Sequence, residues 1–392
     1  MKGARNYQNA AVVGVFVTLV AVAMAIVQYK IPTILPVLMG NLQMDATAAS
    51  WLMTIFVLMM VFSAIPFGIL AQRFGARTVS VVAVAIIVLG SVIGAFSQDT
   101  AVLLASRAVE GIAITAITVC GPILIEGSVD PRDAGTAMGI WGTWGPLGST
   151  VAALATPSLF ALWGMSVLWL VYAGIVVVAA ILMLVIVRKP AEATRQQGGA
   201  RARFSALLTK DILLYFVGFI AFNVCLLAVL SYVPTILQNR GMDATTSGLV
   251  STLPMILSLV SSPFFGRVSD KTGKTKQLLV LTVGFLGPCA FVLYVSTGAL
   301  MWGAAAVMGL LGMGSTGLMI LGLMKVLPDP SLKTIGMGAL ITVQGIGQFL
   351  GTFLVQLLLG PSFDNVVAAG AGVLTIGIVG TVCLAACRFR AE

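Results

Sequence analysis

Residues 32–47 read PTILPVLMGNLQMDAT, and two pieces of this stretch occur again about half a chain later. The segment PTIL at 32–35 returns at 234–237, and MDAT at 44–47 returns at 242–245. A similar spacing relates further short matches, which are Gly68 with Gly266, Gly75 with Gly273, and Asp130-Pro131 with Asp329-Pro330. Solenoid repeats have periods of about 20 to 50 residues, so the longer spacing indicates a duplicated half-molecule.

The composition places most of the chain in lipid. It is 59% hydrophobic and 9% charged, with a mean hydropathy of +1.07, whereas soluble domains carry about 25% charged residues. A membrane helix needs about 20 apolar residues, and twelve continuous runs reach about that length, at approximately 11–39, 50–70, 78–97, 101–126, 134–157, 164–188, 212–238, 247–266, 277–297, 299–324, 334–359 and 366–387. Continuous runs predict helices and not barrel strands.

The expected fold is therefore an all-α membrane protein. Its twelve transmembrane helices should form two pseudo-symmetric six-helix bundles, because the sequence repeats at the scale of half the chain. We expect the bundles to consist of residues 1–188 and 211–392, and the polar segment 189–210 to join them as a cytoplasmic linker.

The basic residues divide unevenly between the two sides of this predicted bundle. They cluster at the chain ends and in alternate connections, and only Lys30, Arg107 and Arg240 of the 22 Lys and Arg residues do not. Cytoplasmic loops carry the excess of Lys and Arg, so both termini and the segments 71–78 and 189–210 are expected inside the cell. The net charge of +9 thus reports orientation in the membrane, which we expect to be a bacterial inner membrane, and requires no nucleic-acid partner.

The composition gives no reason to expect a cofactor or a metal. The chain has no His, and its five cysteines fall inside apolar runs without CxxC spacing, as buried free thiols do. It also lacks a GxxxxGK[ST] loop, so ATP is not expected to drive it directly. The first apolar run is too long for the hydrophobic region of a cleavable signal peptide.

A lysine stands inside the first apolar run. Lys30 follows Gln28 and Tyr29, and the apolar run continues beyond it to Met39. A charged side chain within a membrane helix is costly and normally faces the bundle interior or a water-filled cavity. The alternative is that Lys30 extends to the outer interface, against which the continuing apolar run argues.

A second pair of charges lies in the fourth apolar run. Arg107 and Glu110 are three residues apart, so they share one helix face. Two interpretations remain open: a mutually neutralised pair near the outer interface, or a cavity-facing pair in which Arg107 binds an anion and Glu110 carries a proton.

Several of these segments resemble signatures of the major facilitator superfamily. GILAQRFGAR at 68–77 resembles its cytoplasmic pattern GxLADRxGRR, although Gln72 replaces the aspartate, and GRVSDKTGK at 266–274 is a second copy that keeps the acid as Asp270. Arg107 to Gly111 is similar to the family's RxxQG pattern, with Glu110 in place of Gln. The resemblance extends over essentially the whole chain and implies two six-helix bundles that work by alternating access, with the substrate bound between them.

The resemblance also implies a cytoplasmic gate. In the family, Glu126 and Arg132 would belong to the charge cluster that closes the inner side, and the internal repeat relates Lys325 to Glu126. We expect Asp270 and Glu126 to stabilise the outward-facing state by pairing there. The residues expected to form this gate are Gln72, Arg73, Glu126, Arg132, Asp270 and Lys325.

The expected function is secondary transport of a small solute. Two cations, Lys30 and Arg107, stand against one acid, Glu110, which favours a carboxylate or inorganic anion carried with protons. Residues expected to complete the site are Tyr29, Gln28, Asn223, Tyr232, Gln344 and Gln348.

The alternative function is proton-coupled multidrug efflux. The glycine-proline stretch 135–148 resembles part of a signature of drug/proton antiporters, although Ser149 stands where a second glycine is common. A channel and an enzyme are less consistent with the duplicated gate motif and the absence of a nucleophile-base pair. We expect a monomer, while the direction of transport, import or export, stays open.

Overall fold

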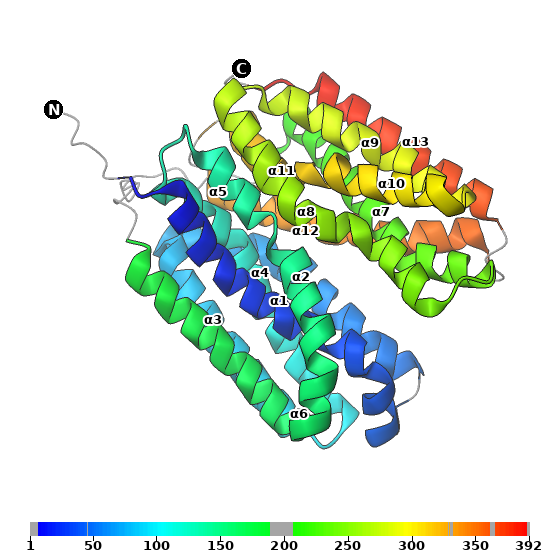
Figure 1. The fold of residues 1–392 in the computed structure, drawn as a ribbon. Helices are drawn as coiled ribbons and strands as arrows, with labels where there is room; N and C mark the ends of the chain where they lie inside the picture. Colours follow the sequence, from blue (N-terminus) through cyan, green and yellow to red (C-terminus); the bar gives the residue numbers. More distant parts are fainter. Residues whose placement is uncertain are drawn as a thin grey trace. The chain divides into compact units, whose positions relative to one another are not determined.

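The computed structural model describes residues 7–44, 46–188, 207–327, 329, 332–360 and 365–389. This part of the chain is helical throughout and contains no β-strand (Figure 1). The predicted linker, 189–210, lies outside the described residues except for its last four positions.

Six helices belong to the first half of the chain. They are α1 (Ala10–Asn41), α2 (Ala46–Phe74), α3 (Ala76–Ala95), α4 (Thr100–Ser128), α5 (Ala134–Trp141) and α6 (Trp144–Ile186). Short polar side chains begin several of them, because the first N–H groups of a helix need acceptors. Asn9 accepts from the second residue of α1, and Asp99 accepts from Val102 of α4.

The second half contains α7 (Lys210–Asn239), α8 (Ala244–Thr272), α9 (Thr275–Val295), α10 (Gly298–Leu310), the short 3₁₀ helix η2 (Gly312–Gly314), α11 (Ser315–Val326), α12 (Lys333–Leu359) and α13 (Val366–Ala386). Thr209 and Asp243 cap the starts of α7 and α8 with side-chain oxygens. Gly273 ends α8 in the left-handed conformation, with φ of +69°, which a glycine adopts at little cost.

The twelve-helix prediction is confirmed in outline. Eleven segments of the described chain are long and apolar enough to cross a membrane. One of them, Ala134–Ile186, contains a break at Gly164, whose φ of +71° is not helical. This glycine separates two membrane-length stretches of α6, which account for the twelfth crossing.

Two of the predicted apolar runs do not form continuous helices in the structure. The run 134–157 is interrupted between α5 and α6, where the Thr143 hydroxyl donates to the Ile140 carbonyl at 2.7 Å. The run 299–324 is interrupted by η2, whose glycines pack tightly against neighbouring helices. A Cβ at Gly314 would lie 2.2 Å from the Phe265 ring, and one at Gly312 would lie 2.7 Å from Leu286.

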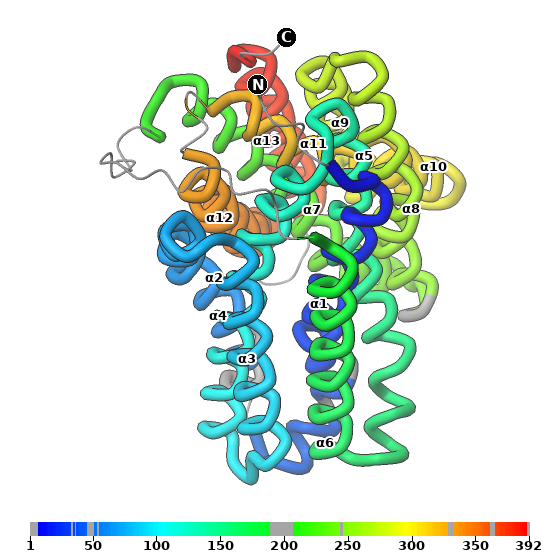
Figure 2. Tube along the Cα trace, turned by 90° about the vertical axis from the view of Figure 1, so that its left-hand side faces the viewer, coloured from blue at the N-terminus to red at the C-terminus, as the bar shows by residue number. Residues whose placement is uncertain are grey.

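The chain forms two compact units. One consists of Met1–Arg201 with Met337–Thr342, and the other of Ala202–Gly336 with Val343–Glu392. Within the first unit, α1 lies alongside α6, and α4 packs against both α2 and α3 (Figure 2). Within the second unit, α13 packs against α7 and α9, and α8 packs against α10.

The helices are apolar on their outer faces as well as inside. On α6, the side chains of Val178, Ile181 and Val185 are 58%, 54% and 76% exposed. A water-soluble protein rarely exposes a continuous apolar face of this kind, whereas lipid accommodates it. The chain is therefore a multi-pass membrane protein.

The first described residues hold the ends of two helices in the first unit. The Gln8 side chain donates to the Ile186 carbonyl at 3.0 Å and accepts from the Arg188 N–H at 2.8 Å. The Gln8 backbone N–H donates to the Ser128 carbonyl at 3.0 Å. We call these three contacts the Gln8 clasp, and they satisfy polar groups where α4 and α6 end.

Candidate functional site

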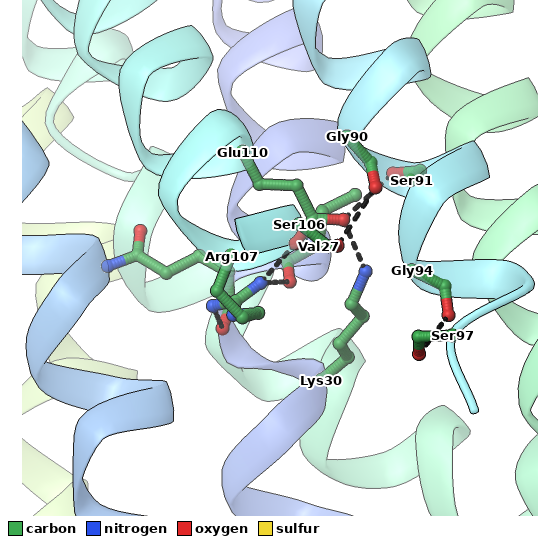
Figure 3. A network of polar contacts seen from close by, with 10 residues as sticks. Val27, Lys30, Gly90, Ser91, Gly94, Ser97, Ser106, Arg107 and Glu110 are labelled. Carbon is green, nitrogen blue, oxygen red and sulfur yellow. Dashed lines mark hydrogen bonds and ion pairs between the residues drawn. The ribbon is translucent and has the colours of Figure 1, made fainter. Parts of the chain in front are cut away.

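Three charged side chains from two helices meet inside the first unit. The Lys30 ammonium on α1 lies 2.7 Å from Glu110 Oε1 on α4, and Arg107 Nη1 pairs with Glu110 Oε2 (Figure 3). The exposed fractions of Lys30, Arg107 and Glu110 are 0%, 1% and 0%. We call these three residues the charge cluster.

The guanidinium of Arg107 joins α4 to α1. Its Nη1 donates to the Val27 carbonyl at 3.1 Å and its Nη2 donates to the Gln28 carbonyl at 3.0 Å. The guanidinium carbon also lies 4.6 Å from the centroid of the Phe56 ring on α2. Because Arg presents several donors in a rigid plane, it can hold the acid and the backbone of α1 at once.

Small residues on α3 make room for the cluster. Ser91 donates to Glu110 Oε1 at 2.9 Å, and Ser106 of α4 donates to the Gly90 carbonyl at 2.9 Å (Figure 3). A Cβ at Gly90 would lie 3.0 Å from Glu110 Cγ, and one at Gly94 would lie 2.4 Å from Trp169 Nε1. These glycines therefore set the close approach of α3 to α4 and α6.

An aromatic ring covers the lysine. Lys30 Nζ lies 4.1 Å from the centroid of Trp169 on α6, a distance at which a cation is attracted to the ring face. The indole N–H of Trp169 and the Nε–H of Arg107 are buried without a hydrogen-bond partner in the described part of the chain. Buried donors are costly when unpaired, so the cluster has capacity for a further acceptor.

The charges of the cluster do not cancel. Lys30 and Arg107 are two cations and Glu110 is one anion, so the ionised cluster carries a net charge of +1. A buried net charge is expensive, and a buried ion pair adds little stability of its own. This arrangement is suited to attracting an anion or to releasing a proton.

The structure decides between two of the sequence-based alternatives. Lys30 is fully buried against Glu110, so the interpretation that places it at the outer interface is wrong. Arg107 and Glu110 do pair, as their spacing predicts, but Lys30 joins them. Gln28 and Tyr29 are half-buried on α1, and Gln28 contributes its backbone carbonyl to the Arg107 contact.

The expected site residues of the second unit take part in contacts within that unit. Asn223 on α7 donates to the Phe219 carbonyl of its own helix at 2.8 Å, and the Tyr232 hydroxyl donates to the Thr352 carbonyl on α12. Gln344 and Gln348 are half-buried on α12. Their contribution to a binding site stays a prediction.

The expected gate residues lie at or near helix ends. Gln72 and Arg73 are exposed near the end of α2, Glu126 is half-buried near the end of α4, and Arg132 is exposed in the following turn. Asp270 is half-buried near the end of α8. In the second unit, Lys325 near the end of α11 donates to the Thr275 hydroxyl at 2.6 Å. The pairing of these residues as a gate stays a prediction.

Sequence reasoning missed three residues that contact the cluster. Ser91, Trp169 and Phe56 lie in apolar runs without any distinguishing motif. Their roles depend on which helices are neighbours and on how each helix is rotated about its axis. An aromatic residue or a serine in a membrane helix carries neither piece of information.

The comparisons with known proteins agree with this architecture. A sequence model of the Major Facilitator Superfamily matches residues 14–352. The "Probable 4-methylmuconolactone transporter" of Cupriavidus pinatubonensis (strain JMP 134 / LMG 1197) is 24% identical over 352 residues, covering 82% of this chain and 75% of the relative. The "Multidrug resistance protein MdtG" of Serratia proteamaculans (strain 568) is 27% identical over 258 residues, covering 62% of each chain.

A solved structure shares the fold. The human organic anion transporter MFSD10 (TETRAN) superposes with a TM-score of 0.74 at 14% identity, covering 96% of this chain and 100% of the other. The helical fold and these matches define the class as a secondary transporter of the membrane. This chain belongs to the Major Facilitator Superfamily.

Proposed function

We propose that this transporter carries a small anion, a carboxylate or an inorganic anion, together with protons. The observation that supports the proposal is the charge cluster, which is buried and has one cation in excess. A substrate anion would neutralise that excess, as low-dielectric surroundings require. The unpaired N–H donors of Arg107 and Trp169 would supply hydrogen bonds to such an acceptor.

The second candidate function is proton-coupled efflux of drugs. It is supported by the similarity to the multidrug resistance protein of Serratia proteamaculans and by the glycine-proline stretch 135–148. Lipophilic cations would be repelled by a cluster of charge +1, since like charges in a low dielectric interact strongly. The cluster therefore favours the anion.

Thermal stabilisation of the purified protein by candidate ligands tests this choice. We expect carboxylates or inorganic anions to raise the melting temperature, because a ligand that binds only the folded state stabilises it. The effect should disappear in Lys30→Ala and Arg107→Ala, which remove the excess cation. The control is Lys210→Ala, which removes an exposed lysine at the start of α7.

The opposite pattern would favour drug efflux. Stabilisation by lipophilic cations alone, unchanged in Lys30→Ala and Arg107→Ala, would contradict anion transport. Saturable exchange of internal for external substrate in proteoliposomes would identify a carrier, whereas conductance at channel rates would exclude one.

We also propose that both termini lie in the cytoplasm of a bacterial cell, with residues 40–48 and 239–246 outside. The support is the distribution of Lys and Arg along the sequence. In cells, an impermeant thiol reagent should label a cysteine introduced at Gln43 or Asn239 and should not label one at Gln197. Labelling at Gln197 alone would reverse the orientation.

A further inference from the structure

We infer that Lys30, and not Glu110, carries the transported proton, so that one proton and one anionic charge bind to the cluster together. This inference rests on the proposed function and assigns its coupling residue. It starts from the contacts of the charge cluster, in which Lys30 Nζ and Glu110 Oε1 are 2.7 Å apart.

The hydrogen bonds of Glu110 make it a poor place for the proton. Oε1 accepts from Lys30 and from Ser91, and Oε2 accepts from Arg107. Both oxygens thus accept from donors, and hydrogen bonds to the carboxylate favour its ionised form over the protonated acid.

Arg107 is excluded as the proton carrier by its chemistry. The guanidinium stays charged in proteins, and two carbonyls of α1, those of Val27 and Gln28, hold it besides Glu110. Arg107 can therefore remain paired with Glu110 whether or not Lys30 is charged.

The remaining group, Lys30, has the surroundings that a reversible charge needs. Lys30 faces Glu110 on α4, with Arg107 beyond it. Ser91 on α3 donates to the same Glu110 oxygen, Oε1, as Lys30 does. The ring of Trp169 on α6 covers the ammonium. Ser91 and Trp169 neither gain nor lose a proton at physiological pH. An amine in place of the ammonium would keep a hydrogen bond to Glu110 and lose the cation–π contact with Trp169.

Charge counting then links the proton to the substrate. With Lys30 as the neutral amine, Arg107 and Glu110 cancel and the cluster has no net charge. With Lys30 as the ammonium, a bound monoanion again gives no net charge. The step is balanced: Nζ takes one proton from water as the anion binds, and returns it to water as the anion leaves. Transport of a monoanion would therefore be electroneutral.

The test compares Lys30→Arg with the wild type in the full-length protein. Arginine keeps the positive charge but cannot lose its proton. Lys210→Arg, at an exposed position, is the matched control. Benzoate, succinate and phosphate are added separately to protein in weak buffer, and a pH-indicator dye records protons taken up on binding. In proteoliposomes, accumulation of the anion driven by a pH gradient is compared with exchange of the anion in the absence of that gradient.

We expect the wild type and Lys210→Arg to take up protons with the anion and to accumulate it. Lys30→Arg should still bind and exchange the anion, but it should take up no protons on binding. Its accumulation of the anion in proteoliposomes should fall to the level of empty vesicles. A second variant, Lys30→Gln, serves if the arginine does not fit the site, and it should take up no protons with any anion that it still binds.

Other results would overturn the inference. Proton uptake that persists in Lys30→Arg or in Lys30→Gln would assign the proton elsewhere. A wild type that binds an anion without taking up protons would overturn this inference and leave the anion proposal standing. A wild type that binds none of the three anions would overturn both.

Discussion

Glu110→Ala is expected to lower the free energy of unfolding by about 3–5 kcal/mol, the range found when one partner of a buried ion pair is removed. The substitution leaves Lys30 and Arg107 as two buried like charges, and it removes the acceptor that both use. The measurement is a denaturation midpoint, by heat or by SDS, on protein purified in mild detergent.

Lys30→Met is the comparison that makes this prediction specific. It also removes an ion pair, but it leaves Arg107 and Glu110 as a neutral pair held to the carbonyls of α1. We therefore expect a clearly smaller loss than in Glu110→Ala. Ser91→Ala, which removes one hydrogen bond to the acid, should cost about 1 kcal/mol. Equal losses in Glu110→Ala and Lys30→Met would contradict the charge-counting argument.

Gly148→Ala is expected to destabilise the first unit by about 1–3 kcal/mol, as overpacking of a tight contact does. A Cβ at Gly148 on α6 would lie 2.3 Å from the Cβ of Ala25 and 3.0 Å from the carbonyl oxygen of Val22, both on α1. Neither atom is the end of a flexible side chain, so the two helices would have to separate. Because α1 also carries Lys30, substrate binding should weaken in parallel.

Gly145→Ala is the matched control, three residues earlier on the same helix. A Cβ at Gly145 would meet no described atom within 4 Å, and alanine is the better helix former by about 1 kcal/mol. We expect unchanged or slightly higher stability. Equal destabilisation by the two substitutions would show that the loss at Gly148 is not caused by its contact with α1.

The membrane helices could be predicted from the sequence because the bilayer imposes their length. A run of about 20 apolar residues has few alternatives in lipid, so most predicted extents agree with the helices to within a few residues. The interruptions could not be predicted. The 3₁₀ turn at Gly312–Gly314 interrupts the 299–324 run where Leu286 and Phe265 of other helices lie close, whereas glycines elsewhere continue a helix.

The charge cluster could be predicted only in part. Arg107 and Glu110 are on one helix, where a spacing of three residues makes their side chains neighbours. Lys30 is 80 residues away from Glu110 in the sequence, so their contact depends on how α1 and α4 are placed and rotated. The cost of a charge in lipid indicated that Lys30 needs a partner, but it did not identify which residue.

The Gln8 clasp has a consequence for how the first unit is completed during biosynthesis. Gln8 is synthesised before its partners Ile186 and Arg188, which lie 178 and 180 residues further along the chain. Domains generally fold in the order of their synthesis, yet this contact must wait until α6 has been made. A nascent chain that stops before Ile186 would leave Gln8 without its anchor on α6.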